Sequence, residues 1–283
     1  MPNAVGFVDD TTQYASRAML EYVRDFLDTN GWTILEQDVA SDTRYWIAEG
    51  PGYVGPDGQI KVYCGMRAYQ NVPSDYYNLS VATFTGYVSG NVFTAQPGYR
   101  ESGVPGHNQR IDYWLTCNDR RFAFALKVGT PVYESAYCGL ALPYANPRQY
   151  PYPIVCGGML DGIPATRFSD TAQSIPYKGN RANMGLRWVT GAYITPYAYP
   201  WNNASLGGTT SNIRPTDTYY PLPRVVLNDN ASNVYGELDG VHYITGFDNV
   251  VENTLTIGGL TYVVIQDVWR TGFPDFYALR LDA

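Results

Sequence analysis

The sequence predicts an α+β fold that is predominantly antiparallel β, with one N-terminal amphipathic helix and long Pro- and Tyr-rich loops. Three observations support this class. Apolar residues recur at helical spacing in one early segment, they alternate with polar residues in most later segments, and Gly, Pro, Asn or Asp separates these segments. With 283 residues and 45% hydrophobic content, the chain is long and apolar enough to bury a sizeable core.

The predicted helix covers Tyr14–Leu27. Asp10 and Gln13 resemble a capping box before it, and Asn30-Gly31 is a favourable C-terminal stop. The pattern is typical of a helix that covers one face of a sheet, and we prefer this interpretation to a helix that lies on a membrane. The apolar stripe consists of Ala15, Ala18, Met19, Tyr22, Val23 and Phe26.

From Trp32 onward the hydrophobic period changes to two, which predicts strands. Two of these strands are joined by a turn at Asn118-Asp119, and Ala95–Asn108 reads as a loop rich in Gly and Pro. With the helix, the strands predict an α+β scaffold domain over residues 1–145. The predicted strands of this domain are Trp32–Gln37, Arg44–Glu49, Gln59–Arg67, Tyr77–Tyr87, Tyr113–Cys117 and Arg121–Gly129.

The run Tyr133–Pro153 is too apolar for an exposed loop and too rich in Pro for a helix. It must be held by other parts of the fold or by another chain, and we predict a docking arm onto neighbouring subunits. Residues 146–223 continue with little periodicity, and only Leu186–Thr190 and Ala192–Thr195 read as strands. Because their aromatic content is too high for a solvated linker, we expect an extended Pro-, Gly- and Tyr-rich interaction region that a partner orders.

Regular patterns return in residues 224–283, which we expect to pack with the scaffold domain as a set of C-terminal strands. Gly258-Gly259 is a suitable two-residue turn between two of them. The predicted strands are Arg224–Leu227, Gly240–Thr245, Leu255–Ile257, Leu260–Val268 and Phe276–Leu281.

The composition narrows the possible partners. Charged residues make up only 16% of the chain, whereas about 25% is usual, and there are 26 Tyr, which suit both strands and surfaces that become buried against partners. The net charge is −7 and Arg120-Arg121 is the one adjacent Arg pair, which argues against nucleic-acid binding. No uncharged apolar run approaches about 18 residues, so no membrane span is predicted. The first residues also lack the features of a signal peptide.

The residues of catalysis and metal binding are scarce. The two histidines, His107 and His242, nearly exclude catalytic triads and His-rich metal sites, and nucleotide-binding and nucleophile-elbow motifs are missing. His107 could act with Arg100 and Glu101, but a solvated loop residue is the simpler interpretation. Paired acids for glycoside hydrolysis could be chosen from Glu134, Glu237 and Asp239, as in any protein with 26 acidic residues.

The sequence therefore predicts no enzyme, no cofactor and no metal. The spacing of the cysteines matches neither a zinc site nor a disulfide framework, which predicts free thiols in a protein made in a reducing cytosol. These cysteines are Cys64, Cys117, Cys138 and Cys156.

Aromatic residues of the Tyr- and Pro-rich segments are the candidates for an interface. Within them, Trp201 with Tyr197 and Tyr199 could stack on sugar rings of a host-surface glycan, although interface or core anchors are the preferred interpretation. The full candidate set is Tyr133, Tyr137, Tyr144, Tyr150, Tyr152, Tyr197, Tyr199 and Trp201.

Several short segments, spread over most of the chain, carry a family resemblance. They are Tyr76–Leu79, Phe84–Tyr87, Asn118–Phe122, Tyr133–Tyr137, Leu142–Ala145, Gln149–Pro153, Val234–Gly240 and Phe276–Arg280. Together they resemble virion structural proteins of tailed bacteriophages and prophages of Gram-negative bacteria. The resemblance implies a non-enzymatic subunit of the phage tail, made in the host cytoplasm and placed in the neck and collar or near the tail tip and baseplate.

A subunit of this kind would form a homo-oligomeric ring and bind other virion tail proteins. No catalytic residue comes with the resemblance. Beyond Gln149–Pro153, residues 146–223 have no residue-by-residue counterpart in it, so a peripheral module that binds a host-surface glycan is the alternative function.

Overall fold

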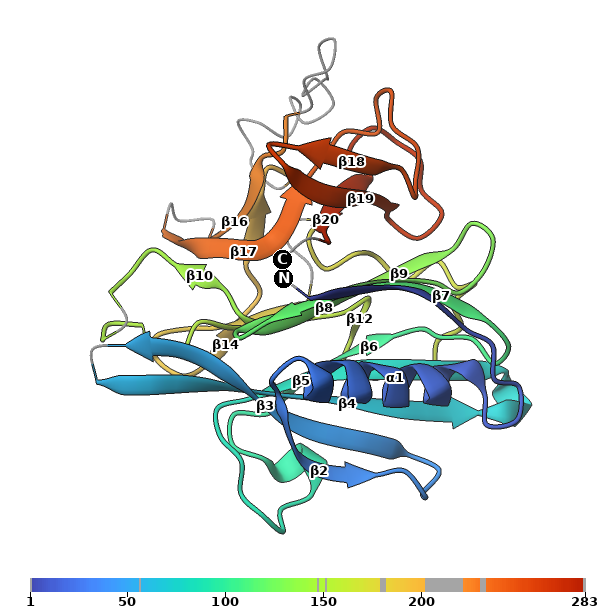
Figure 1. The fold of residues 1–283 in the computed structure, drawn as a ribbon, viewed down its shortest axis with the longest axis horizontal. Coiled ribbons are helices and arrows are strands. Elements are labelled where there is room, and N and C mark those ends of the chain that lie inside the picture. The colour runs from blue at the N-terminus through green and yellow to red at the C-terminus, as the bar shows by residue number, and fades with distance from the viewer. Residues whose placement is uncertain are drawn as a thin grey trace.

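The computed structural model describes residues 2–55, 57–146, 148–150, 152–178, 182–201, 221–229 and 233–281. Within them the chain forms three antiparallel sheets and one α-helix, which confirms the predicted fold class. Figure 1 shows these sheets as three layers: a middle sheet, named A, has sheet C on one side and sheet B with the helix on the other.

Each sheet combines strands from distant parts of the sequence. In spatial order, sheet A contains β1 (Asn3–Val8), β7 (Ile111–Asn118), β8 (Arg121–Lys127), β9 (Tyr133–Leu140), β11 (Ile154–Gly157), β13 (Met184–Arg187) and β14 (Tyr193–Ile194). Sheet B contains β12 (Leu160–Asp161), β6 (Arg100–Val104), β5 (Tyr76–Phe84), β4 (Gly58–Asn71), β3 (Arg44–Gly55) and β2 (Thr33–Asp38). Sheet C contains β15 (Tyr197–Tyr199), β16 (Arg224–Asn228), β17 (Val234–Tyr243), β20 (Phe276–Arg280), β19 (Leu260–Gln266) and β18 (Thr254–Ile257), and β10 (Leu142–Pro143) also pairs with β17.

Helix α1 (Ala15–Thr29) lies where it contacts both sheet A and sheet B (Figure 1). Tyr22 packs on Tyr113 of sheet A with ring centroids 4.6 Å apart, and the indole N–H of Trp46 in sheet B donates to the Leu20 carbonyl at 2.9 Å. The helix thus packs on sheets, as predicted, with Met19 and Val23 of the stripe fully buried and Tyr22 and Phe26 partly buried.

The two ends of α1 agree only in part with the ends predicted from the sequence. Asn30 caps the C-terminus, and Gly31 adopts φ +90°, which confirms the predicted stop. The predicted capping box is wrong: the Asp10 carboxylate accepts from the backbone N–H of Gln13 at 3.1 Å, but this turn precedes the helix. The first helical N–H groups instead donate to carbonyls of the loop at His107, with Ser16 N 3.0 Å from the His107 oxygen.

The layers share one core. Sheet C meets sheet A where the Ser135 hydroxyl lies 2.7 Å from the Tyr277 hydroxyl, and sheet B meets it where the Cys138 thiol donates to the Ala82 carbonyl at 3.0 Å. All four cysteines are buried free thiols. The described part of residues 146–223 contributes strands to all three sheets, so the chain itself orders these strands.

Among the described strands of four or more residues, four were not predicted: β1, β6, β9 and β11. Strand β6 falls inside the predicted loop Ala95–Asn108, and β9 falls inside the predicted docking arm. Every residue of β9 is buried, because both of its faces are covered by other layers. A strand buried on both faces lacks the alternation that reveals a half-exposed one.

Candidate functional site

The most exposed apolar strand is β1, at the open edge of sheet A beyond β7 (Figure 1). Alternate side chains point to opposite faces, and Val5 and Phe7 are 56% and 50% exposed. The strand register aligns Val5 with Ser135 of β9. The face that carries Val5 and Phe7 therefore turns toward sheet C, but sheet C does not cover it at β1. The Arg110 guanidinium lies 3.9 Å from the centre of the Phe7 ring.

The backbone of β1 is also open on one side. Cys117 N donates to the Pro2 carbonyl at 3.1 Å, so the even-numbered residues of β1 turn their polar backbone groups toward β7. Alternation then turns the N–H and C=O groups of Asn3, Val5 and Phe7 to the open edge. An edge of this kind is a template for an added strand.

Three of the eight predicted interface residues lie in the core, so the prediction is corrected for them. Tyr133, Tyr137 and Tyr150 are 2%, 0% and 2% exposed. They are held by this chain: Tyr133 donates to Glu252, and Tyr137 donates to the Leu140 carbonyl at 2.8 Å. Buried rings cannot dock a neighbour, so the first part of the predicted arm, Tyr133–Leu140, is the core strand β9 instead of a free arm.

The other predicted aromatics are at least partly exposed, and they do not form one cluster. Tyr197 and Tyr199 are half-buried on β15, and Tyr152 packs with the Arg187 guanidinium 5.8 Å from its ring centre. Trp201 is half-buried, and its indole N–H donates to the Pro274 carbonyl at 2.6 Å. Its ring also packs edge-on against Tyr243. Trp201 therefore anchors its segment to sheet C, which does not favour a role in stacking on sugars.

Tyr144 is the most exposed of the eight, at 57%, and it borders a polar pocket of about 260 Å³ in sheet C. Its hydroxyl donates to Glu237 at 2.9 Å. The pocket forms where β17 bulges, at Gly240 with φ +74°. Before the bulge β17 pairs with β10, and after it β17 pairs with β20. Charged residues in its lining are Arg224, Glu237, Asp239 and Arg280, with His242 beside them.

The acids of this pocket are held by partners. Glu237 is bound by Arg224 as well as Tyr144, and Asp239 accepts from the Asn118 amide at 2.6 Å. Burial lowers the pKa of His242, which favours the neutral imidazole. The pocket can hold polar groups of a ligand. Its two acids are engaged in ion pairs and hydrogen bonds instead of being placed as an acid and a base.

The third acid considered for catalysis, Glu134, lies elsewhere, on β9. It is fully buried, and neither carboxylate oxygen has a hydrogen-bond partner among the described residues. Burial, reinforced by the nearby carboxylate of Asp267, raises the pKa of Glu134 well above its usual value. Glu134 does not line the sheet C pocket that Glu237 and Asp239 line, so the three acids do not share that site.

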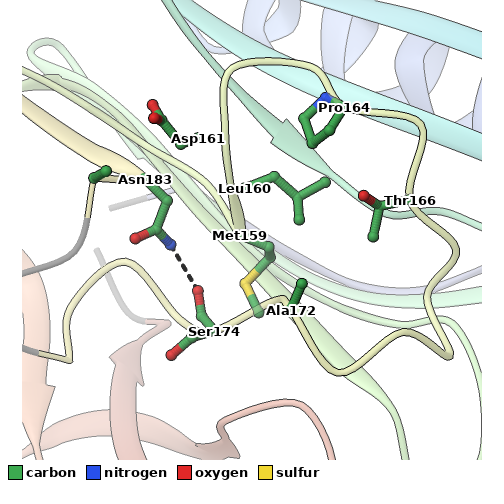
Figure 2. Close-up of a pocket in the computed structure, with 9 residues that line it drawn as sticks. Met159, Leu160, Asp161, Pro164, Thr166, Ala172, Ser174 and Asn183 are labelled. Atoms are coloured by element: carbon green, nitrogen blue, oxygen red, sulfur yellow. Dashed lines mark hydrogen bonds between the residues drawn. The ribbon is translucent and has the colours of Figure 1, made fainter.

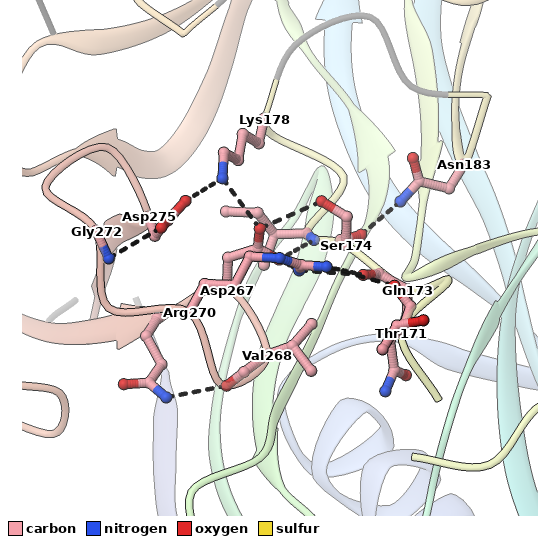
Figure 3. A network of polar contacts seen from close by, with 12 residues as sticks. Thr171, Gln173, Ser174, Lys178, Asn183, Asp267, Val268, Arg270, Gly272 and Asp275 are labelled. Carbon is pink, nitrogen blue, oxygen red and sulfur yellow. Dashed lines mark hydrogen bonds and ion pairs between the residues drawn. The ribbon is translucent and has the colours of Figure 1, made fainter. Parts of the chain in front are cut away.

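Asp267 is the centre of a buried polar network that joins sheet C to residues 171–178 (Figure 3). Its carboxylate accepts from Ile175 N at 2.8 Å and pairs with Lys178 at 3.3 Å and Arg270 at 3.1 Å. Lys178 also pairs with Asp275. The network fixes the loop after β19 to a segment without regular secondary structure, which gives it a structural role.

A second pocket, of about 390 Å³, lies beside this network (Figure 2). Met159, Leu160 and Pro164 give it an apolar lining, while Asn183 donates to the Ser174 carbonyl at 2.7 Å across one side. Asp161 at the pocket is largely exposed and pairs with Arg100 at 2.9 Å. The lining offers small apolar contacts and hydrogen-bonding groups that are already engaged.

The remaining candidate residues carry no further site. His107 packs against Phe168 with ring centroids 5.0 Å apart, and burial lowers its pKa. In the part of the chain that the structure describes, no three His, Cys, Asp or Glu side chains are grouped closely enough to hold a metal ion. No described helix has the length and apolar character needed to cross a bilayer.

The β1 edge was missed by sequence reasoning because its pattern is weak. In Asn3–Val8 the inward positions Ala4, Gly6 and Val8 are small, and the outward positions Val5 and Phe7 are apolar too. Neither face therefore stands out as polar. Comparison of the sequence with protein-family models and with curated proteins finds no match.

Proposed function

We propose that this chain is a non-enzymatic structural component of a tailed-phage virion, a subunit of a homo-oligomeric ring or collar in the tail. It would be made in the host cytoplasm and lie in the neck or near the tail tip and baseplate. The observation that carries the proposal is the open, uncharged edge of sheet A, where Val5 and Phe7 are about half exposed. A sheet edge with unpaired backbone groups and exposed apolar side chains is a template for pairing with another chain.

The segments that carry the family resemblance also support the proposal by their positions. β10 pairs with β17, β17 pairs with β20, and Ser135 of β9 contacts Tyr277 of β20. The resembling segments Tyr133–Tyr137, Leu142–Ala145, Val234–Gly240 and Phe276–Arg280 are therefore packed together at the junction of sheets A and C. The resemblance to virion structural proteins therefore lies in residues that hold the fold together, as expected for a structural subunit.

The low charge of the chain fits the same role. Only 16% of its residues are charged, and many of these are used in ion pairs within the chain, such as Arg67–Glu101 and Arg44–Glu21. A surface with few unpaired charges has a small desolvation cost when it becomes buried in an assembly.

The proposal is tested by capture on tail-tube protein. We expect the purified chain to bind immobilised tail tubes of the phage or prophage that encodes it, and deletion of its gene to give virions with an incomplete neck or tail tip in electron micrographs. Unaltered virions together with a chain that ignores the tube would contradict a structural role. In that case a glycan-binding module, with Tyr144 and the polar pocket of sheet C as its candidate site, would be the second candidate.

A further inference from the structure

We propose that two copies of the chain pair through β1 in antiparallel orientation, with Val5 of one copy opposite Val5 of the other. This inference rests on the proposed homo-oligomeric function and names the surface that carries the contact. It would join sheet A of both copies into one continuous sheet. Such a two-fold contact is closed, so a ring would be built from these dimers through a second contact.

The first support is that β1 lacks the features that keep edge strands apart. Natural edges are protected by charged side chains, Pro, bulges or short length. β1 pairs with β7 over six residues without a register shift, and Asn3–Val8 contains neither a charge nor Pro.

The other edges of the described sheets are protected. β2 has the same length as β1, but it contains a register shift between Ile34 and Glu36 and carries two acids, Glu36 and Asp38. The remaining edge strands β12, β14, β15 and β18 are two to four residues long. Among the edges that the structure describes, β1 alone is long, regular and uncharged.

The backbone selects the register. The groups that face the open edge belong to Asn3, Val5 and Phe7, so a second β1 strand makes the most hydrogen bonds when Asn3 faces Phe7 and Val5 faces Val5 of the partner. This register uses all outward groups and gives about six hydrogen bonds. A shift by two residues would leave one residue of each copy without a partner.

Charge makes a second copy the fitting occupant. In this register no charged residue of β1 faces another, because the strand has none. The nearest acid in the sequence, Asp9, lies four residues from the two-fold axis, which places the two Asp9 residues about 27 Å apart along the strands. Charge repulsion over that distance is largely screened at physiological salt.

The side chains fit the same arrangement. Val5 and Phe7 project from one face of the strand, so Val5 would meet its equivalent directly and Phe7 would lie diagonally from the partner's Val5. Both side chains lose the exposure that they have in the single chain. The Arg110 guanidinium, already on one side of the Phe7 ring, leaves the other side of the ring to the partner.

Disulfide trapping of Val5→Cys tests the proposal. Directly opposed residues of a hydrogen-bonded antiparallel pair have Cα atoms about 5.5 Å apart, a separation that a disulfide spans. We expect the full chain with Val5→Cys to form a covalent dimer under mild oxidation at micromolar concentration, seen on a non-reducing gel. The four native cysteines give little background, since they are buried free thiols.

Val54→Cys is the matched control, because Val54 is 82% exposed on β3, in sheet B. It measures cross-linking by random collision, and we expect it to remain at least tenfold slower. A second variant, Val5→Lys, should shift the dimer to monomer in sedimentation at the same concentration while the chain remains folded. Equal cross-linking of both cysteine variants, or a Val5→Lys chain that associates like the wild type, would overturn the β1 contact.

The outcomes separate this inference from the proposed function. A wild-type oligomer that binds tail tubes but does not trap through Val5→Cys would refute the β1 contact and leave the structural role intact. A chain that traps through Val5→Cys but ignores tail tubes would support the contact and refute the virion role.

Discussion

The Asp267→Ala variant is expected to lose about 3–5 kcal/mol of unfolding free energy, because it removes one side of a buried ionic network. Asp267 is fully buried and accepts from Ile175 N at 2.8 Å while it pairs with Lys178 and Arg270. Without its carboxylate, the buried N–H of Ile175 loses its partner, and so do two cations whose side chains are 21% and 31% exposed. The loop after β19 would keep only its other contacts with residues 171–178, such as those from Arg270 to the Gln173 carbonyl and from Lys178 to Asp275 (Figure 3).

Urea unfolding followed by tryptophan fluorescence measures this effect. Asp161→Ala is the control, because Asp161 also pairs with an arginine, but its side chain is 60% exposed. Exposed ion pairs contribute about 0–1 kcal/mol, so we expect the control to unfold close to the wild type. Similar losses of unfolding free energy for both variants would show that the Asp267 network stabilises the chain no more than an exposed ion pair does.

Glu134→Leu is expected to raise the stability of the chain at neutral pH by about 1–3 kcal/mol, the cost of a buried polar group without partners. Burial raises the pKa of Glu134, and the Asp267 carboxylate raises it further. A raised folded-state pKa means that the folded chain holds this proton more tightly than the unfolded chain. The resulting stability is fully present below the unfolded pKa and is lost as the pH rises through the folded pKa.

The pH dependence separates this effect from simple repacking. The wild type should lose the Glu134 contribution as the pH rises from the usual glutamate pKa through the raised folded-state pKa of Glu134, and the Glu134→Leu variant should lack that part of the slope. Glu101→Leu is the matched control: Glu101 is 4% exposed, but it binds Arg67 at 2.8 Å and Ser80 at 2.5 Å. Its replacement should destabilise the chain. If Glu134→Leu also destabilised it, the carboxyl would have a partner that its present contacts do not show.

The sequence predicted the elements whose pattern is local. The stripe of α1 and the stop at Asn30-Gly31 depend on helical spacing and backbone preference, and both are observed. The Gly258-Gly259 turn between β18 and β19 has φ of +62° and +80°, which a two-residue hairpin turn requires. The alternating patterns of β4 and β16 were recognised for the same reason.

Two strands buried between layers, β6 and β9, were not recognised, although the similarly buried β5, β7 and β8 were. β9 and β6 are covered on both faces, and their residues are small, aromatic or even charged, such as the buried Glu101 and Glu134. Only the assembled sheets provide the environment that makes a strand of such a sequence. This is why the Tyr- and Pro-rich run read as a docking arm.

For the candidate site, the sequence predicted the type of residue but not which of these residues lie at the surface. Aromatic composition indicates that rings are buried somewhere, but it does not distinguish the core from an interface, so Tyr137 and Tyr144 received the same assignment. They differ because Tyr137 lies between sheets A and C, whereas Tyr144 follows β10 at the rim of a pocket. The β1 edge depends on which strand ends the sheet, a property of topology that local sequence does not contain.

The most direct test of homo-oligomeric assembly is the mass of the purified wild-type chain in solution, measured by sedimentation over a range of micromolar concentrations. We expect an even multiple of the chain mass, as pairing through β1 requires, and a higher assembly when tail-tube protein is added. A chain that stays monomeric at every concentration, with and without the tube, would contradict both the assembly and the β1 contact.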